Sequence, residues 1–246
     1  MRVHIRRRLC AAAFIGAALL AVRTPLSAQV ADNAIRTFVL FDQLEQRDVR
    51  GAHPVAWDII GWVGGDFNRF WFKSSGAHAT RGGGADAEFE ALYGRLVAPF
   101  WDLQIGARVD TRVDDGARRT RASALVALEG LAPYWFELEP SLSISDRGDI
   151  AAEFKATYDL FVTQRLIVQP RLDLRAAVQE VRSFGVGSGL NDAAIGLRLR
   201  YELRRKLAPY AGINWTRSFA GTADLARAAG ERTSTAALLG GIRVWF

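Results

Sequence analysis

Two histidines and three carboxylates are the residues of this chain best suited to metal chemistry. His53 and His78 lie in segments that the sequence predicts to be loops. Imidazole binds several transition metals, although one ring needs further ligands, and a lone loop histidine is more often simply solvated. Glu137 and Glu139 lie two residues apart, so a strand would place both on one face, and Asp102 belongs to the neighbouring hairpin unit. These five residues are the candidate metal ligands.

Further carboxylates follow the same face of successive predicted strands, together with arginines. Two interpretations of this charged face are open. The first, which is favoured, is a structural lattice of ion pairs, and the second is a metal site or a transport path. The carboxylates are Asp58, Glu88, Glu90, Asp102, Glu129, Glu137, Glu139, Asp159 and Glu202, and the arginines that would oppose them are Arg171, Arg198 and Arg200.

The elements that carry these charges have a period of two. In residues 101–109 every second side chain is apolar, and those between are polar or glycine. A helix would scatter these residues around its axis, whereas a strand sorts them onto two faces. The chain is therefore predicted to be all-β. The same alternation recurs in residues 136–144, 152–160, 166–178 and 193–203.

One face of these strands is apolar and the other is charged, which fits two kinds of protein. A soluble sandwich would bury the apolar face, whereas a membrane barrel would turn it to lipid and the charges to its lumen. The segments run for about 9 to 13 residues, which is longer than ordinary strands and long enough to cross a bilayer when tilted. Lipid offers no partner to an open sheet edge, so the sheet must close. We therefore predict an antiparallel transmembrane β-barrel.

The connections between strands support an outer-membrane barrel. Short turns, such as residues 64–66 and 97–99, alternate with mostly longer polar loops, such as 111–120 and 220–234. Short periplasmic turns and longer outer loops are typical of these barrels, as are aromatic girdles at the strand ends. About twelve strands are predicted, beginning near Phe38, Ala56, Asn68, Glu88, Phe100, Arg121, Tyr134, Ile150, Leu166, Leu190, Ala208 and Thr235. The aromatic residues at strand ends are Phe100, Trp101, Tyr134, Trp135, Tyr210, Trp245 and Phe246.

Residues 1–28 have the pattern of a cleaved signal peptide, with a basic start, an apolar run and a small-residue cleavage site. A short segment, 29–37, would precede a single barrel domain, 38–246. The signal contains five Arg, no acid and Cys10, the one cysteine of the chain. The remaining 27 basic and 26 acidic residues leave a net charge of +1, so a nucleic-acid partner is not expected. The expected surroundings are outer-membrane lipid, and the oligomeric state is open.

An enzymatic function is not expected. Outer-membrane phospholipases also use twelve-stranded barrels, but they need a serine and a histidine at the rim, and no predicted strand carries a histidine. Gly82, Gly83 and Gly84 lack the strand-to-helix context of a phosphate-binding loop.

Ten stretches of the chain resemble the copper resistance protein B family of outer-membrane proteins, from about residue 37 to 246. They are FVLFDQLE (38–45), AWD (56–58), GWVGGD (61–66), VAPFWDLQ (97–104), GLAPYWFE (130–137), TQRL (163–166), QPR (169–171), GSGL (187–190), LRLRYE (197–202) and APY (208–210). The resemblance implies copper resistance at the outer membrane, alongside periplasmic copper-handling proteins. Copper would be bound, sequestered or passed across the membrane, in an oxidation state that the sequence leaves open. The alternative is a structural or partner-docking barrel without metal affinity of its own.

The chain departs from this family in one respect. Many members carry a Met- and His-rich segment before the barrel, whereas residues 29–36 here contain neither residue. Thioethers are the ligands that favour Cu(I). Any copper chemistry of this protein is therefore expected in the barrel itself and not in a flexible arm before it.

Overall fold

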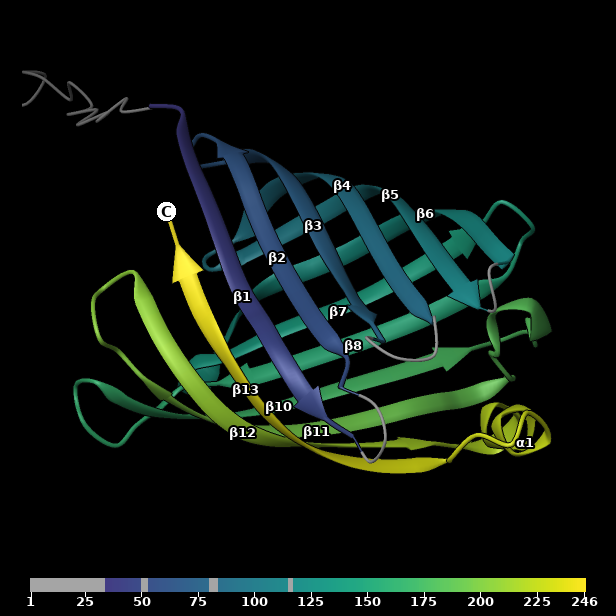
Figure 1. Cartoon of the computed structure of the whole chain (residues 1–246). Coiled ribbons are helices and arrows are strands. Elements are labelled where there is room, and N and C mark those ends of the chain that lie inside the picture. The colour runs from purple at the N-terminus through teal and green to yellow at the C-terminus, as the bar shows by residue number, and fades with distance from the viewer. Residues whose placement is uncertain (1–33, 50–52, 80–83, 115–116) are drawn as a thin grey trace, which may run out of the picture. The chain divides into compact units, whose positions relative to one another are not determined.

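The computed structural model describes residues 34–49, 53–79, 84–114 and 117–246 (Figure 1). The predicted signal peptide and the first part of segment 29–37 lie outside the described residues. The strands are β1 (Arg36–Asp48), β2 (Val55–Gly64), β3 (Asn68–His78), β4 (Ala85–Ala98), β5 (Trp101–Asp114), β6 (Ala117–Ala132), β7 (Phe136–Ser145), β8 (Ile150–Tyr158), β9 (Leu160–Phe161), β10 (Leu166–Ala177), β11 (Gly189–Tyr201), β12 (Leu207–Ser218) and β13 (Ser234–Trp245). The helices are η1 (Pro133–Trp135), η2 (Arg182–Phe184) and α1 (Ala220–Ala228).

The strands form one closed antiparallel barrel. Neighbours along the chain pair with each other, and β1 pairs with β13 to complete the ring (Figure 1). β8 and β9 both pair with β10 and are two parts of one strand interrupted at Asp159, so the barrel has twelve strands. In the part of the chain described, no helix is long and apolar enough to span a bilayer.

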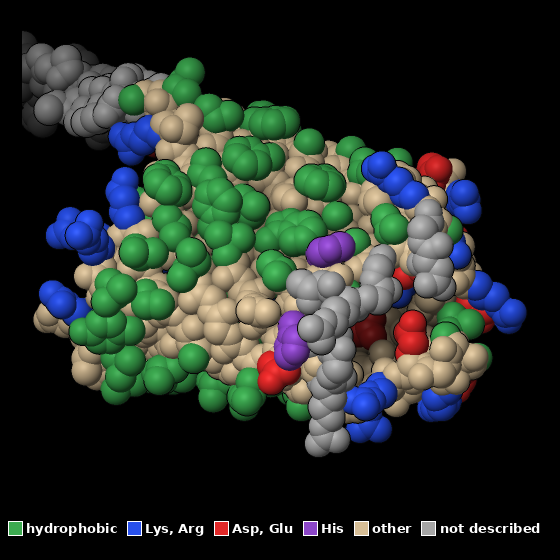
Figure 2. All heavy atoms as spheres, in the orientation of Figure 1, with side chains coloured by type: hydrophobic (Ala, Val, Ile, Leu, Met, Phe, Trp, Pro, Cys, Tyr) green, Lys and Arg blue, Asp and Glu red, His purple; other side chains and the backbone are tan. Residues whose placement is uncertain are grey.

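The side chains are distributed in the reverse of a soluble protein. On β5, Asp102, Gln104 and Arg108 are 8%, 0% and 3% exposed, whereas Ile105 and Val109 are 53% and 38% exposed. On the face seen in Figure 2, hydrophobic side chains dominate the barrel wall, and Lys and Arg side chains gather toward its two ends. A soluble sandwich would bury the apolar face and expose the charges. The prediction of a membrane barrel is therefore confirmed.

The loop predicted at residues 111–120 is much shorter than expected. β5 continues to Asp114 and β6 begins at Ala117. The charged residues of this stretch belong to the strands, and Asp114 is paired both along β5 and across the hairpin. Arg112 lies 3.1 Å and Arg119 lies 3.3 Å from the carboxylate of Asp114. The high charge of this stretch is therefore a poor indicator of where the two strands end.

The segment 220–234, predicted to be a loop, contains the helix α1. Its sequence is rich in alanine, which has the highest helix propensity. Thr222 and Ala223 are buried, so one side of the helix packs on the barrel. α1 lies at the outer end of the barrel together with η2 (Figure 1).

Aromatic residues occupy strained turns at the periplasmic end. Phe100, Tyr134 and Trp135 have φ values of 67°, 68° and 68°, in the left-handed region, which costs about 1–2 kcal/mol for each such residue. All three side chains are exposed, as expected for an interfacial girdle. Tyr134 belongs to η1, and the strand predicted to begin near it, β7, begins two residues later at Phe136. Tyr210 was also wrongly assigned to a girdle, because it is buried on the lumen side of β12.

Candidate ion pathway through the barrel lumen

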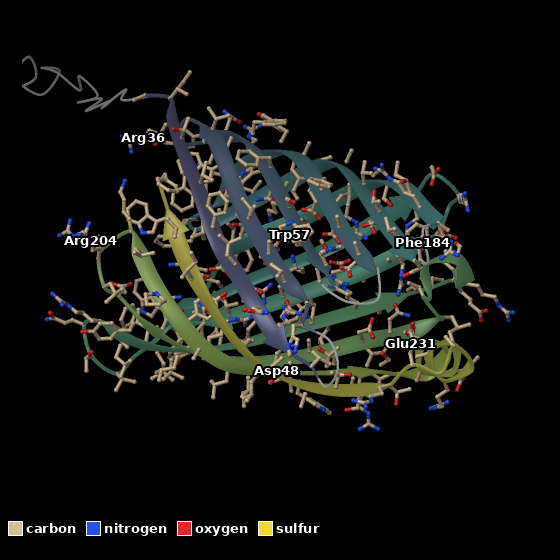
Figure 3. All side chains as sticks on the ribbon, in the orientation of Figure 1. Arg36, Asp48, Trp57, Phe184, Arg204 and Glu231 are labelled. Carbon is tan, nitrogen blue, oxygen red and sulfur yellow. The ribbon has the colours of Figure 1, made fainter. Side chains whose placement is uncertain are left out.

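Two cavities lie inside the barrel. The outer cavity has a volume of about 790 Å³ and reaches the outer loops, and the periplasmic cavity has a volume of about 720 Å³ and reaches the turns at Pro99 and Leu131. Figure 3 shows polar side chains filling the space between the walls, with Phe184 and Glu231 at the outer end and Arg36 and Arg204 at the other. Five residues line both cavities, and we call them the junction: Asp58, Ser75, Glu88, Lys155 and Arg171.

Arg171 links three aspartates at the junction. Its guanidinium lies 3.0 Å from Asp58, 3.4 Å from Asp42 and 3.0 Å from Asp173. Arg171 is on β10, whereas Asp42 and Asp58 are on β1 and β2, so these ion pairs cross between strands that are not neighbours. Asp42 lies at a bulge of β1, where the pairing with β2 shifts register, and it also contacts Arg243 at 2.8 Å. The two cavities therefore meet at a ring of paired charges.

Lys73 is the centre of a second cluster, in the periplasmic cavity. Its ammonium lies 2.6 Å from Glu139 and 2.9 Å from Glu129, and its side chain is 7% exposed. Gln104 donates a second hydrogen bond to Glu129, at 2.8 Å. Because these residues come from β3, β5, β6 and β7, the cluster ties four strands together through the lumen.

A third cluster surrounds Arg108 in the outer cavity. Its guanidinium lies 2.8 Å from Glu153, 3.2 Å from Asp110 and 3.8 Å from Glu88. Arg121 contacts Asp110 from the other side, at 3.1 Å. These contacts agree with the interpretation of the charged face as a lattice of ion pairs.

A fourth cluster supports the seam between the first and last strands. Arg198 donates to Glu45 at 3.1 Å and to Gln43 at 3.1 Å, and the Tyr210 hydroxyl donates to Glu45 at 3.1 Å. Arg200 pairs with Asp159 at 2.5 Å, next to the interruption between β8 and β9. The predicted lumen positions of Arg198, Arg200 and Asp159 fit these contacts. Glu202 directly follows the end of β11, and its lumen position stays a prediction.

The two cavities differ in charge. Eight carboxylates and five Lys or Arg side chains line the periplasmic cavity, which leaves three excess negative charges. Ten carboxylates and eleven Lys or Arg side chains line the outer cavity, which leaves one excess positive charge. A lumen wall of one sign concentrates ions of the opposite sign. The periplasmic cavity is therefore suited to holding cations.

The loop between β10 and β11 covers part of the outer cavity. The guanidinium of Arg121 lies over the Phe184 ring, 4.7 Å from its centre, and Arg119 donates to the Ser183 carbonyl at 3.2 Å. Thr222 of α1 accepts hydrogen bonds at 2.9 Å from the Gly187 backbone and from the Asn191 side chain. α1 is thereby joined to the loop that carries η2, with which it forms a cap, and to β11, and residues of both helices line the outer cavity.

Three of the five predicted metal ligands line the same cavity. Asp102, Glu137 and Glu139 all face the periplasmic cavity, but each has a protein partner. Arg69 lies 3.0 Å from Asp102, Lys73 lies 2.6 Å from Glu139, and Thr157 donates to Glu137 at 3.0 Å. Among the described residues there is no group of three or more His, Cys, Asp and Glu side chains placed to hold a metal ion.

The two histidines lie apart from these carboxylates. His53 precedes β2, as predicted for a loop, and its Nδ1 lies 3.3 Å from Asp48. His78 is the last residue of β3, so its assignment to a loop was wrong, as was the premise that no strand carries a histidine. Neither histidine lines either cavity.

The expectation that the protein is not an enzyme remains a prediction.

Lys73 is a lumen residue that the sequence analysis missed. Lys73 directly precedes Ser74, Ser75 and Gly76, where the apolar alternation of the sequence stops. The alternation of side chains along β3 could have placed Lys73 in the lumen. Lys73 lies on the same face as the buried Trp71, opposite the exposed Phe70 and Phe72.

A closed antiparallel barrel with an apolar outer face, a charged lumen and longer loops at one end defines an outer-membrane β-barrel protein. The fold resembles that of the NanC porin, with a TM-score of 0.54 and 12% identity over 85% of this chain and 99% of that one.

The comparisons also identify the family. The family described as copper resistance protein B precursor matches residues 35–246. Copper resistance protein B of Escherichia coli is 40% identical over 215 residues, which cover 87% of this chain and 71% of that protein. The copper resistance protein B homolog of Pseudomonas syringae pv. tomato is 40% identical over 218 residues, which cover 89% and 72% of the two chains. The chain belongs to the copper resistance protein B family. It is an outer-membrane protein with a role in copper resistance, and the resemblance identified in its sequence is confirmed.

Proposed function

We propose that the barrel contributes to copper resistance by passing copper ions through its lumen. The observation that carries this proposal is the excess of three negative charges around the periplasmic cavity of a barrel of this family. This excess would raise the local concentration of cations at the periplasmic end. Carboxylate oxygens would supply passing ions with weak, exchangeable contacts, as conduction requires.

The ion pairs of the lumen favour passage over tight capture. A copper ion that binds Glu139 or Asp102 must compete with Lys73 or Arg69, which already lie at 2.6 Å and 3.0 Å. Competition of this kind lowers affinity, so a bound ion leaves readily. The junction would resist passage most, because an ion that crosses it must pass Arg171 and compete with this guanidinium for its three aspartate partners.

Copper tolerance and ion flux test the proposal together. Cells lacking the gene should become more sensitive to copper, and the intact gene should restore tolerance. Purified barrel in planar bilayers should conduct cations in preference to anions, and the Glu129→Gln/Glu137→Gln variant should reduce that preference. Unchanged tolerance under both aerobic and anaerobic growth would contradict the role of the gene. Anion preference of the intact protein would contradict the proposed pathway.

The alternative is a partner-docking or structural barrel without metal affinity of its own. The ion pairing of Asp102 and Glu139 favours this alternative, because it leaves these side chains already engaged. Calorimetric titration of the barrel with Cu(II), combined with the flux measurement, separates the two. Absence of both heat and flux, with copper tolerance still lost on deletion, would favour docking.

A further inference from the structure

One wall of the periplasmic cavity is apolar, which a path for metal ions does not require. Phe38, Trp62 and Trp71 lie directly opposite one another on β1, β2 and β3 and face the lumen. Their rings form a row, with 6.0 Å between the centres of Phe38 and Trp62 and 6.2 Å between those of Trp62 and Trp71. Ile60 also lines the cavity and packs beside the two tryptophans. A hydrated cation gains nothing from such a surface, whereas an organic body does.

The aromatic rings are placed to receive positive charge. The guanidinium of Arg69 lies over Trp62, 4.8 Å from the ring centre, and the ammonium of Lys73 lies 5.8 Å from the centre of Trp71. Cations are attracted to these faces by the ring quadrupole, most strongly where water is excluded. The row therefore already holds two cations of the protein.

The remaining polar groups of the cavity favour a positively charged ligand. The cavity carries three excess negative charges. Glu137 lines it and accepts a hydrogen bond from the neutral hydroxyl of Thr157 at 3.0 Å. The volume of about 720 Å³ lies in the range of pockets that enclose small organic molecules.

We propose that the periplasmic cavity is a binding site for an amphipathic organic cation. The apolar or aromatic body of the ligand packs on the row formed by Phe38, Trp62 and Trp71, and its positive charge is neutralised by Glu137. This site shares its net negative charge and Glu137 with the proposed copper pathway, but it also depends on the apolar wall, which that pathway does not use, so Trp62→Leu distinguishes failure of one proposal from failure of the other.

Two hydrophobic ions of nearly the same shape and opposite charge provide the test. Tetraphenylphosphonium and tetraphenylborate are titrated into the full barrel in a neutral detergent, with heat or tryptophan fluorescence as the signal and protein-free detergent as the blank. Tetraphenylphosphonium should bind saturably to one site, at least about tenfold more tightly than tetraphenylborate, because the cavity is net negative.

Matched variants assign the binding to this cavity. Trp62→Leu should weaken binding by about tenfold because the ligand loses apolar contact area, and Glu137→Gln should do so because its positive charge loses a carboxylate partner. Trp215→Leu, on the outer face of β12, and Glu202→Gln, beyond the end of β11, should leave the affinity within about twofold, since neither residue lines a cavity. Folding of each variant is checked by its heat-dependent migration on gels, and Glu137→Gln keeps the test valid if Trp62→Leu does not fold.

Three results would overturn the proposal. They are absence of saturable binding above the detergent blank, equal affinity for the two ions, and an equal loss in the test and control variants.

Discussion

Replacing Lys73 with methionine tests whether the lumen clusters stabilise the barrel. The substitution keeps the length of the side chain but removes its charge, so Glu129 and Glu139 lose a partner at 2.9 Å and 2.6 Å. Breaking a buried ion pair costs about 3–5 kcal/mol because the remaining charge is uncompensated. The side chains of Glu129 and Glu139 are still 29% and 19% exposed. We therefore expect a loss near the lower end of that range, about 3 kcal/mol.

Urea unfolding of the barrel refolded into lipid vesicles measures this loss. With a denaturant slope of about 1–3 kcal/mol per molar, the midpoint should fall by roughly 1 M or more. Lys206→Met is the matched control, because Lys206 lies in the exposed turn between β11 and β12. It loses the contact of its ammonium with the Trp245 ring, 5.1 Å from the ring centre, so this control should cost no more than about 0.5–1 kcal/mol, well below the loss in Lys73→Met.

A compensated variant shows whether charge is the cause. Lys73→Met combined with Glu129→Gln and Glu139→Gln removes the stranded charges and should recover most of the lost stability. The reasoning is refuted if Lys73→Met unfolds at the midpoint of the unmodified protein. It is also refuted if the triple variant is as unstable as the single one, since the loss would then come from packing.

Three other variants test the pathway, the cap and the lipid face. Arg171→Gln should increase both conductance and cation preference in planar bilayers, because it removes a positive charge from the junction. Arg147→Gln, in an exposed outer turn, should change neither. An unchanged reversal potential in Arg171→Gln would contradict the assignment of the junction to the ion pathway. Thr222→Val removes the acceptor of two hydrogen bonds that tie α1 to β11 and to the loop after η2, at a cost of about 1–3 kcal/mol. Trypsin should therefore cut faster after the exposed Arg182, and equal cutting rates would argue against a fastened cap. Ile105→Arg places a charge on the lipid face of β5 and should destabilise the barrel by about 2 kcal/mol or more in vesicles, and a smaller effect would count against a membrane-embedded β5.

Strand positions could be predicted closely because lipid and lumen impose opposite requirements on alternate side chains. The predicted starts near Asn68, Ile150 and Leu166 coincide with those of β3, β8 and β10. Local alternation carries this information where it is regular, since each side chain then indicates the face on which it lies.

Contacts across the lumen could not be predicted in the same way. Arg171 was expected to face the lumen, but its partners Asp42 and Asp58 lie 129 and 113 positions away in the chain. Such pairs depend on the stagger between strands and on the bulge at Asp42, and neither leaves a local signal in the sequence. The predicted metal ligands were limited for the same reason, because their faces could be inferred but not the cations that occupy them.

The seam between β1 and β13 has a kinetic consequence. The backbones of Val39 and Phe246, which are 207 positions apart in the chain, exchange hydrogen bonds of 3.3 Å and 2.9 Å. The entropic cost of joining such distant segments is met before the ring gains its last pairs, and topologies dominated by distant contacts fold slowly. Until Phe246 docks, two strand edges stay open in a solvent that cannot satisfy them. Loss of the last two residues should therefore slow insertion into the membrane far more than it weakens the finished ring.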